Sequence, residues 1–467
     1  MVRICSGTNG GQPLMRYIST RGGMDPVRFR EAVIIGQAPD GGLLMPEFLP
    51  DVSSDLEGWR GLAFEDLAFE VVRLFADDID DVVLKKILKD AFETFASEDT
   101  IPLVQLDGLN VLELFHGPTL AFKDVALQVL GGLFEHILGR QSGSLNILGA
   151  TSGDTGSAAI AAVRGRPNID IFVLFPDGRT SLMQELQMTT VLDDNVHCLG
   201  IEGTFDDCQE LMKSIFNDLA FKEKYRLGAV NSVNWARVVV QVVYYIYAAL
   251  KFKEPVSFSV PTGNFGNVFA GYLARSMGVP IDRLVLATNK NDILARFFET
   301  GTYALGTVQH TLSPSMDIQV ASNFERFLYL YFNGDSERLV EFLETFYERG
   351  SAKVDHVDSV EPLFLATSVG EEETVETIKS TYESHGYVLD PHSAVGVAAA
   401  SRFKLTSPLI SLATAHPAKF PDAVNEAIGK DVATHAKLKK LVSHATRKTV
   451  LAADELAVKN YLTENAR

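Results

Sequence analysis

The spacing of hydrophobic residues divides this chain into two parts near residue 100. Before that point apolar positions recur at i, i+3 and i+4, for example at Val82, Val83, Ile87, Leu88 and Phe92. This spacing predicts amphipathic helices over 64–75 and 80–95, with a further helix over 25–32. No pattern here suggests chemistry. We therefore expect residues 15–100 to form a mainly helical N-terminal domain that covers or contacts the rest.

From residue 101 onward, short apolar runs alternate with helical patterns. Apolar strands of this kind, most of them followed by a helix, are typical of parallel sheets with helices on both faces. The predicted strands are 111–115, 145–148, 170–175, 196–201, 256–260, 284–287 and 409–412. Because such sheets bind ligands where loops leave the carboxyl ends of the strands, we expect the chemical motifs on strand-to-helix turns.

Length and charge narrow the possible functions. A chain of 467 residues is too long for one simple core and predicts two or three domains. Its 42 basic and 60 acidic residues give a net charge of −18, so a nucleic-acid role has no electrostatic support. The longest apolar run, Val238–Leu250, is too short to span a bilayer and predicts a buried helix.

The cysteines and the N-terminal segment indicate the cellular compartment of the protein. Cys5, Cys198 and Cys208 form no metal-ligand cluster, and an odd number of them fits a reducing cytosol. Residues 1–14 are Gly-rich and lack the apolar core of a signal peptide. We expect this segment to be a disordered extension, with Met15 as an alternative natural start. The protein is thus expected to be cytoplasmic, without a metal, nucleic-acid or membrane partner.

The segment His116–Asp124 contains the first candidate for catalysis. It lies between a predicted strand and a predicted helix over 125–138, and Asp124 is placed to cap that helix. Lys123 follows an apolar pair, where partial desolvation lowers the pKa of a lysine and frees its amine for Schiff-base chemistry. A solvated surface lysine is the alternative interpretation.

Two glycine- and hydroxyl-rich turns are candidates for anion binding. Gly149–Ser157 joins a strand to a helix and offers Thr151, Ser152 and Thr155 at the helix N-terminus. Its Asp154 is unfavourable for an anion and suits a cationic or hydroxyl-bearing group instead. Pro261–Asn267 is a second such turn, whose backbone N–H groups and Asn amides can hold a phosphate dianion. A plain capped turn is the alternative for both.

Two further segments carry candidate binding groups. Asn231–Arg237 places Ser232, Asn234 and Arg237 before an apolar helix, and Arg237 can bind a phosphate or form a structural salt bridge. Residues 412–419 end a buried strand with small side chains and the hydroxyl of Thr414. That hydroxyl can meet the edge of a flat cofactor, and tight packing is the alternative.

These motifs, in the order in which they occur along the chain, resemble those of the threonine synthase family. The resemblance is to its longer subfamily, which has an N-terminal helical domain. The matching segments are 17–22 (YISTRG), 116–124 (HGPTLAFKD), 151–156 (TSGDTG), 231–237 (NSVNWAR), 263–267 (GNFGN), 313–318 (SPSMDI) and 413–420 (ATAHPAKF). The resemblance covers the chain from about Met15 to its C-terminus. The ordered combination is much more specific than any single motif.

The resemblance implies a fold and a cofactor. The family belongs to the tryptophan-synthase-β-like group of pyridoxal-phosphate enzymes (fold type II), with two parallel-sheet α/β domains around a cofactor cleft. A large cofactor-binding domain would comprise 101–144 and 256–467, and a smaller mobile domain would comprise 145–255.

The resemblance also implies roles for the candidate residues. Lys123 would hold pyridoxal 5′-phosphate covalently, and Thr414 would contact its ring nitrogen. The phosphate-binding turn would consist of Gly263, Asn264, Phe265, Gly266 and Asn267. Residues near the substrate carboxylate and the cofactor face would be Thr151, Ser152, Asp154 and Thr155. Candidates for the substrate phosphate would be Ser232, Asn234 and Arg237.

The implied reaction converts O-phospho-L-homoserine and water to L-threonine and phosphate by γ-elimination and β-addition of water. Lys123 would remove the α-proton and serve in several proton transfers. A serine/threonine dehydratase or a phospho-substrate lyase on the same fold is the alternative enzyme, and a non-catalytic ligand-binding homologue is the alternative outside enzymes. We expect a monomer or a homodimer.

Overall fold

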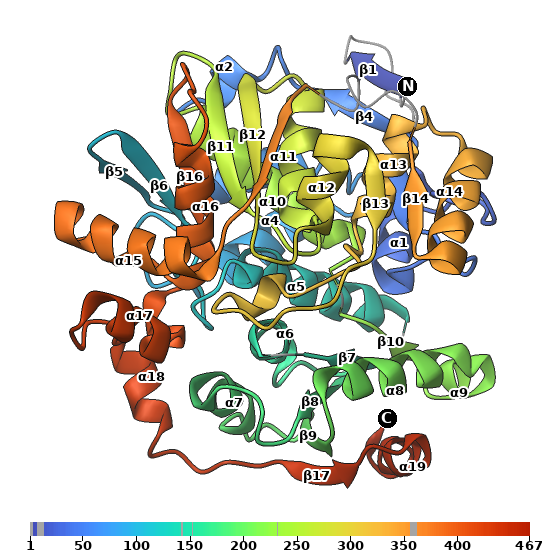
Figure 1. Ribbon diagram of the computed structural model, residues 1–467. Coiled ribbons are helices and arrows are strands. Elements are labelled where there is room, and N and C mark those ends of the chain that lie inside the picture. Colours follow the sequence, from blue (N-terminus) through green and yellow to red (C-terminus); the bar gives the residue numbers. More distant parts are fainter. Residues whose placement is uncertain (1–2, 7–13, 142, 152, 231, 355–361) are drawn as a thin grey trace.

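The computed structural model describes residues 3–6, 14–141, 143–151, 153–230, 232–354 and 362–467. A six-stranded sheet and a five-stranded sheet lie at opposite ends of the molecule, with helices α5 and α6 packed against each other between them (Figure 1). Both sheets are mainly parallel, as the alternation of strands and helices predicts.

The larger sheet has the strand order β15-β12-β11-β16-β6-β5. Its strands are β5 (Leu103–Leu106), β6 (Leu109–Glu113), β11 (Val256–Pro261), β12 (Ile281–Thr288), β15 (Phe364–Ser368) and β16 (Leu409–Ala413). All neighbours are parallel except the edge pair β5–β6. Alternate residues of β12 face opposite ways. Leu284 and Leu286 join the core formed with α11 (Gly266–Ser276), whereas Val285 and Ala287 pack on α16 (Pro391–Ser401).

The smaller sheet has the order β10-β7-β8-β9-β17, and every pair is parallel. Its strands are β7 (Leu145–Ala150), β8 (Ile169–Pro176), β9 (Val196–Glu202), β10 (Leu227–Gly228) and β17 (Thr449–Ala452). One face packs on α6 (Asp154–Val163) and α7 (Leu182–Thr189), and the other on α8 (Phe205–Asn217) and α19 (Glu455–Asn465). Helix α8 ends before Asp218, which caps the separate helix α9 (Leu219–Lys224).

The N-terminal part packs its helices on α5 (Lys123–Gln141) and α10 (Trp235–Ala249). Its elements are β1 (Arg3–Ser6), β2 (Tyr17–Ser19), α1 (Phe29–Ile35), β3 (Leu44–Pro46), β4 (Phe48–Asp51), α2 (Leu56–Trp59), α3 (Phe64–Val72) and α4 (Asp81–Phe92). All residues of α10 are buried, which confirms the prediction of a buried helix there. Among the described residues, no helix combines the length and apolarity needed to cross a membrane.

The remaining elements connect and cover the sheets. Between β12 and β16 these are α12 (Ile293–Thr300), β13 (Thr302–Ala304), the 3-10 helix Pro314–Met316, α13 (Phe324–Tyr331), α14 (Ser336–Arg349), β14 (Ser351–Lys353) and α15 (Glu371–His385). After β16 follow the 3-10 helix Pro417–Lys419, α17 (Pro421–Ile428) and α18 (Ala436–Leu441). The chain after α18 then runs along the smaller sheet to the C-terminus (Figure 1).

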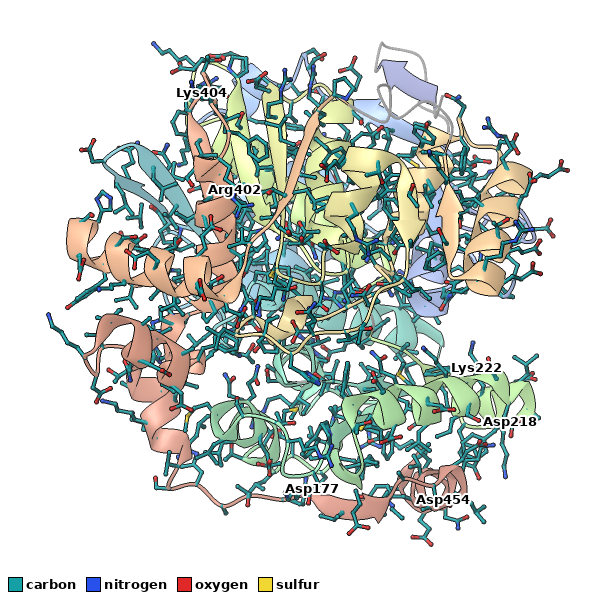
Figure 2. The ribbon with its side chains drawn as sticks, in the orientation of Figure 1. Asp177, Asp218, Lys222, Arg402, Lys404 and Asp454 are labelled. Atoms are coloured by element: carbon teal, nitrogen blue, oxygen red, sulfur yellow. The ribbon has the colours of Figure 1, made fainter. Side chains whose placement is uncertain are left out.

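This C-terminal path corrects the predicted division of the chain. We expected all of 256–467 to belong to the larger unit, but β17 pairs with β9 and α19 packs on the smaller sheet. Lys448 reinforces the docking, because its Nζ donates to Asp177 Oδ1 (2.6 Å) and to Glu185 Oε1 (2.8 Å). Asp177 and the α19 cap Asp454 lie at the same end of the molecule (Figure 2). The apolar pattern of a single strand does not specify which sheet it joins.

The N-terminal extension also differs from expectation. Arg3–Ser6, part of the segment predicted to be disordered, forms β1 and pairs in parallel with β4. Residues 1–2 and 7–13 lie outside the described residues. The open edge of β4 supplies the partner for this pairing. A short strand that depends on a distant edge leaves no signal in its own sequence.

The docking of α19 gives a stability prediction. Leu462 is fully buried in the core of the smaller sheet, whereas Leu456 on the same helix is 65% exposed. We expect Leu462→Ala to lower the free energy of unfolding by about 2–4 kcal/mol, because it leaves a cavity in the core. Leu456→Ala should change it by less than about 0.5 kcal/mol. Urea unfolding of the two variants measures the difference, and equal effects would show that α19 does not belong to this core.

Candidate functional site

Lys123 is held at the carboxyl end of the larger sheet by pairing between two loops. Phe122 N donates to Thr414 O (2.8 Å), and His416 N donates to Leu120 O (3.0 Å), on either side of an isolated bridge between Ala121 and Ala415. Because residues 414–416 directly follow β16, this pairing fixes Lys123 at the end of that strand. Lys123 itself is the first residue of α5.

The loop before Lys123 is fixed from inside by Asp124. Sequence reasoning expected Asp124 to cap the helix, but its carboxylate instead accepts hydrogen bonds from Thr119 N (2.8 Å) and Thr119 Oγ1 (2.7 Å). A Cβ atom on Gly117 would lie 2.4 Å from the Cβ of Asp124, so only glycine fits there. Burial raises the pKa of Asp124. Asp124 therefore sets the shape of the loop that presents Lys123.

The amine of Lys123 lies in a buried, charged environment. The residue is 9% exposed, and its Nζ lies 3.8 Å from Asp154 Oδ2. Burial lowers the pKa of Lys123, and the positive charges of Lys419 and Arg237 lower it further against the opposing effect of Asp154. The direction agrees with the sequence prediction. A lowered pKa increases the fraction of free amine at neutral pH.

The turn from β7 to α6 supplies Asp154, Thr151 and Thr155. Thr151 Oγ1 accepts hydrogen bonds from Gly153 N and Gly156 N (2.9 Å each), so it stabilises the start of α6 and keeps its own hydrogen to donate. Thr155 is half-buried in the first turn of α6, and Ser152 lies outside the described residues. Asp154 Oδ1 accepts from Gln184 Nε2 (2.9 Å) and lies 3.0 Å from Lys419 Nζ.

Asp154 is an ionised carboxylate in this setting. Burial raises its pKa, but the positive charges of Lys419 and Lys123 outweigh burial, and the pKa of Asp154 lies well below its usual value. Its Oδ2 also accepts a long hydrogen bond from Ser315 Oγ (3.4 Å). Asp154 is therefore the acidic centre of a ring of donors.

The turn from β11 to α11 forms an anion cradle. Its N-cap Phe265 adopts a left-handed conformation (φ 63°), and no side chain among the described residues caps α11. The first backbone N–H groups of a helix lack intrahelical partners and attract anions. A Cβ atom on Gly263 would lie 2.8 Å from Ser315 O. The turn therefore approaches the 313–318 segment so closely that only glycine fits at this position. Gly266 opens α11, and Asn264 is exposed.

Asn267 adds a side-chain donor to the cradle. Its Oδ1 accepts hydrogen bonds from Tyr244 OH (2.5 Å) and Tyr245 OH (2.9 Å). These bonds fix the amide so that Nδ2 is the free end. Nδ2 is buried and has no hydrogen-bond partner among the described residues.

Arg237 brings an uncompensated charge close to this cradle. It is 3% exposed on α10, and burial lowers its pKa to about 10. Its Nε and Nη1 are buried and lack hydrogen-bond partners in the part of the chain that the structure describes. The charge of Arg237 lowers the pKa of both Lys123 and Tyr244, so it lies near both. A buried guanidinium without a partner is costly and suits an anionic ligand.

The other residues of the 231–237 segment divide between two roles. Ser232 Oγ lies 2.7 Å from Ser322 Oγ and is half-buried beside the cradle. Asn234 was a predicted ligand, but its Oδ1 accepts from Ala236 N (3.1 Å) and its Nδ2 donates to Val33 O (2.9 Å). Its amide thus caps α10 and joins it to the N-terminal part, which favours a structural role. Asn231 lies outside the described residues.

Thr414 is fixed by its backbone on both sides. Its N donates to Ser393 Oγ (3.0 Å), and its O accepts from Phe122 N. The side chain is buried at the end of β16, directly beside the loop that presents Lys123. This position suits a contact with a flat ring attached to Lys123.

Sequence reasoning missed several polar residues of the site, chiefly Lys419, Gln184, Gln187 and His392. Lys419 lies inside the 413–420 motif, and Ser315 inside the 313–318 motif, but neither received a role. A lysine directly after the small residues that end a buried strand was the available signal for Lys419. The two glutamines are on α7 and have no motif of their own.

The described residues fit a phosphate-bearing carbonyl cofactor. The site offers an amine of lowered pKa for the carbonyl group, an uncapped helix N-terminus with the free donor of Asn267 for the phosphate, and the Thr414 hydroxyl for the ring. No group of His, Cys, Asp and Glu residues in the described chain could hold a metal ion.

Comparison with known proteins identifies the relatives of this chain. Three family profiles match, described as threonine synthase N terminus (residues 16–92), pyridoxal-phosphate dependent enzyme (98–409) and threonine synthase, C-terminal (393–462). The threonine synthase of Pseudomonas aeruginosa is 48% identical over 97% of this chain and 98% of the relative.

Two solved structures are also similar. The crystal structure of pyridoxal-phosphate-bound threonine synthase from Brucella melitensis has a TM-score of 0.94 at 44% identity, covering 97% of this chain and 100% of that one. The crystal structure of threonine synthase from yeast has a TM-score of 0.92 at 43% identity, covering 96% and 98%.

The unpartnered guanidinium of Arg237 yields a prediction with a matched control. Arg326 is also fully buried, but it donates to Leu44 O and Val233 O. We expect Arg326→Met to destabilise the protein by about 2–4 kcal/mol, because it leaves buried carbonyl oxygens without a hydrogen-bond donor. Arg237→Met should leave stability unchanged or higher, yet lose the gain in melting temperature that inorganic phosphate gives the wild type. Thermal unfolding with and without phosphate tests this, and equal destabilisation by both variants would contradict it.

Proposed function

Because this chain belongs to the threonine synthase family of pyridoxal-phosphate-dependent enzymes, we propose that it converts O-phospho-L-homoserine and water to L-threonine and inorganic phosphate. The observation that carries the substrate assignment is Arg237, a buried guanidinium whose Nε and Nη1 have no hydrogen-bond partner among the described residues, in addition to the uncapped N-terminus of α11. Two anion-binding elements beside one lysine suit a phosphate-bearing cofactor and a phosphate-bearing substrate. A dehydratase of serine or threonine needs only the first.

Three parts of the chain would hold the cofactor. We assign the covalent attachment to Lys123, the phosphate to the backbone N–H groups of residues 263–267 with Asn267 Nδ2, and the ring nitrogen to the Thr414 hydroxyl. When bound, pyridoxal phosphate supplies a conjugated ring that accepts electrons from a carbon that loses its proton. The lowered pKa of Lys123 and the free donors of the α11 cradle support these assignments.

Lys123 would also carry protons during the reaction. A buried amine with a lowered pKa can take the proton from the α-carbon and return a proton later. Asp154 Oδ2, 3.8 Å from Lys123 Nζ, can stabilise the ammonium while the proton is held. A proton then leaves the β-carbon, and the γ-carbon loses phosphate and gains a proton. Water finally adds at the β-carbon, so that all atoms of the substrate and of water appear in the products.

The remaining candidates would bind the substrate. We assign its phosphate to Arg237 and Ser232, which lie beside the α11 cradle, and its carboxylate to the hydroxyls of Thr151 and Thr155 with Ser152. The hydrogen that Thr151 keeps free supports its role as a donor. Asp154 would face the substrate amine rather than an anion.

We also propose a cytoplasmic location and a monomeric or homodimeric state. Cys198 and Cys208 are buried free thiols, as in a reducing compartment. The net charge of −18 supports the absence of a nucleic-acid partner.

The assignment of Lys123 predicts the outcome of covalent trapping. Borohydride reduction of the holoenzyme followed by peptide mapping should place the cofactor on Lys123 and on no other lysine. Lys123→Ala should lower kcat by at least about 10³-fold, because both the attachment and the proton transfer are lost. Lys448→Ala, a change at a lysine outside the site, is the control and should retain full turnover. A Lys123→Ala protein with full turnover would overturn the assignment.

Product analysis separates the synthase from its alternatives. With O-phospho-L-homoserine we expect equal amounts of phosphate and L-threonine, because water adds before the product leaves. A phospho-substrate lyase would give phosphate and 2-oxobutanoate instead. A dehydratase would release 2-oxo acids from L-serine or L-threonine, which we expect to be poor substrates because they leave Arg237 without an anion. Colorimetric phosphate and chromatographic amino-acid assays measure these products.

A further inference from the structure

Lys419 occupies a position that no assigned role explains. Its side chain is fully buried, and its ammonium has three partners: Thr119 O (2.8 Å), Gln187 Oε1 (2.7 Å) and Asp154 Oδ1 (3.0 Å). Two of these contacts are hydrogen bonds and the third is an ion pair. Protein acceptors thus surround the buried ammonium, and we expect any function of Lys419 to act through them.

The partners of Lys419 come from both sheets. Thr119 belongs to the loop that presents Lys123 and follows the larger sheet, as Lys419 itself does. Asp154 and Gln187 lie on α6 and α7 of the smaller sheet. Gln187 Nε2 also donates to Thr119 O (2.9 Å), which is a second hydrogen bond between α7 and the Lys123 loop. One buried ammonium thus ties the Lys123 loop to the turn that contains Asp154.

Asp154 poses an electrostatic problem for the proposed substrate site. It sits in a hydroxyl- and glycine-rich turn assigned to a carboxylate, where a second negative charge repels the ligand. Its Oδ1 is directed at Lys419 and its Oδ2 at Lys123 and Ser315. The pairing with Lys419 gives a neutral unit and leaves only one carboxylate oxygen facing the amine of Lys123. The turn can then accept an anion even though it contains an aspartate.

We propose that Lys419 is a positioning residue that neutralises Asp154 within the substrate-binding turn and, through Thr119, fixes Asp154 against Lys123. This inference rests on the proposed function, since it concerns the same turn and the same lysine. Without Lys419, Asp154 would pair with Lys123 alone. The negative charge would stabilise the protonated form of the Lys123 nitrogen and repel the anionic substrate.

The charged groups around Lys123 and Asp154 determine the direction in which the pKa of the Lys123 nitrogen should shift. Lys123 faces Asp154 and Asp124, which raise its pKa, and Lys419 and Arg237, which lower it. Asp154 faces Lys419, Lys123 and His392. Removing Lys419 takes away a positive charge, so the Lys123 nitrogen should lose its proton at higher pH. Removing the charge of Asp154 should have the opposite effect.

The test uses four holoenzymes: wild type, Lys419→Met, Asp154→Asn and the double variant. The absorbance of the bound cofactor, titrated against pH, reports the proton on the nitrogen that joins it to Lys123. We expect Lys419→Met to raise the titration midpoint by at least about 1 pH unit and Asp154→Asn to lower it, since a charge at this distance shifts a pKa by that order. The double variant should return close to the wild-type midpoint.

Kinetics provides the second readout. KM for O-phospho-L-homoserine should rise at least about tenfold in Lys419→Met, because the unpaired carboxylate repels the substrate, and should recover in the double variant. The control Lys448→Met removes a lysine that bridges Asp177 and Glu185 outside the site, and it should change neither quantity. The methionine fills the buried volume of Lys419 without its charge.

The outcomes distinguish a positioning role from a merely structural one. An unchanged midpoint in Lys419→Met, or a double variant that keeps the shifted midpoint, would overturn the proposal. If Lys419→Met does not fold, comparison of Asp154→Asn with the double variant decides, and equal midpoints in those two proteins would overturn it. The titration needs no turnover, so it tests Lys419 even if the product assay rejects the proposed substrate.

Discussion

The site depends on the burial of charge. Lys123, Asp154, Arg237 and Lys419 are all buried, where each isolated charge costs several kcal/mol unless it is paired or hydrogen-bonded (about 3–5 kcal/mol for breaking one buried pair). The chain pairs Asp154 with Lys419 and leaves Arg237 without a partner among the described residues. The same burial lowers the pKa of Lys123. A reactive amine and a group suited to bind an anion therefore arise from one cause, the exclusion of water.

The N-terminal part does more than cover this site. Arg326 donates to Leu44 O of β3 and to Val233 O of the 231–237 segment, and it pairs with Asn323. Asn323 Nδ2 in turn donates to Ser232 O (3.1 Å) and to Asn264 O (3.2 Å). These bonds connect β3 with the 231–237 segment and with the turn that forms the anion cradle. The N-terminal part thus helps to fix the backbone on which phosphate binding depends.

Sequence patterns predicted the local elements and a desolvated lysine of lowered pKa, but not the long-range pairing. Apolar runs located most strands because burial on both faces requires them. The motif order led to Lys123, and the Gly263–Asn267 turn does form an uncapped helix start. Asn234, a predicted ligand, caps α10, and an asparagine at a helix start serves as a cap as readily as a ligand. The roles of Lys419 and β17 depend on partners far away in the chain, which no local pattern specifies.

The contact around Lys419 joins electrostatics to the arrangement of the two sheets. Asp154 and Gln187 belong to helices on the smaller sheet, whereas Thr119 and Lys419 belong to loops that follow strands of the larger one. Separating the sheets at this point would break the ion pair between Lys419 and Asp154 and the hydrogen bond from Lys419 to Gln187. The arrangement in which Asp154 is neutralised is therefore the one in which it faces Lys123. The ammonium of Lys419 both neutralises Asp154 and holds it against Lys123, so the same contact determines the charge and the position of Asp154.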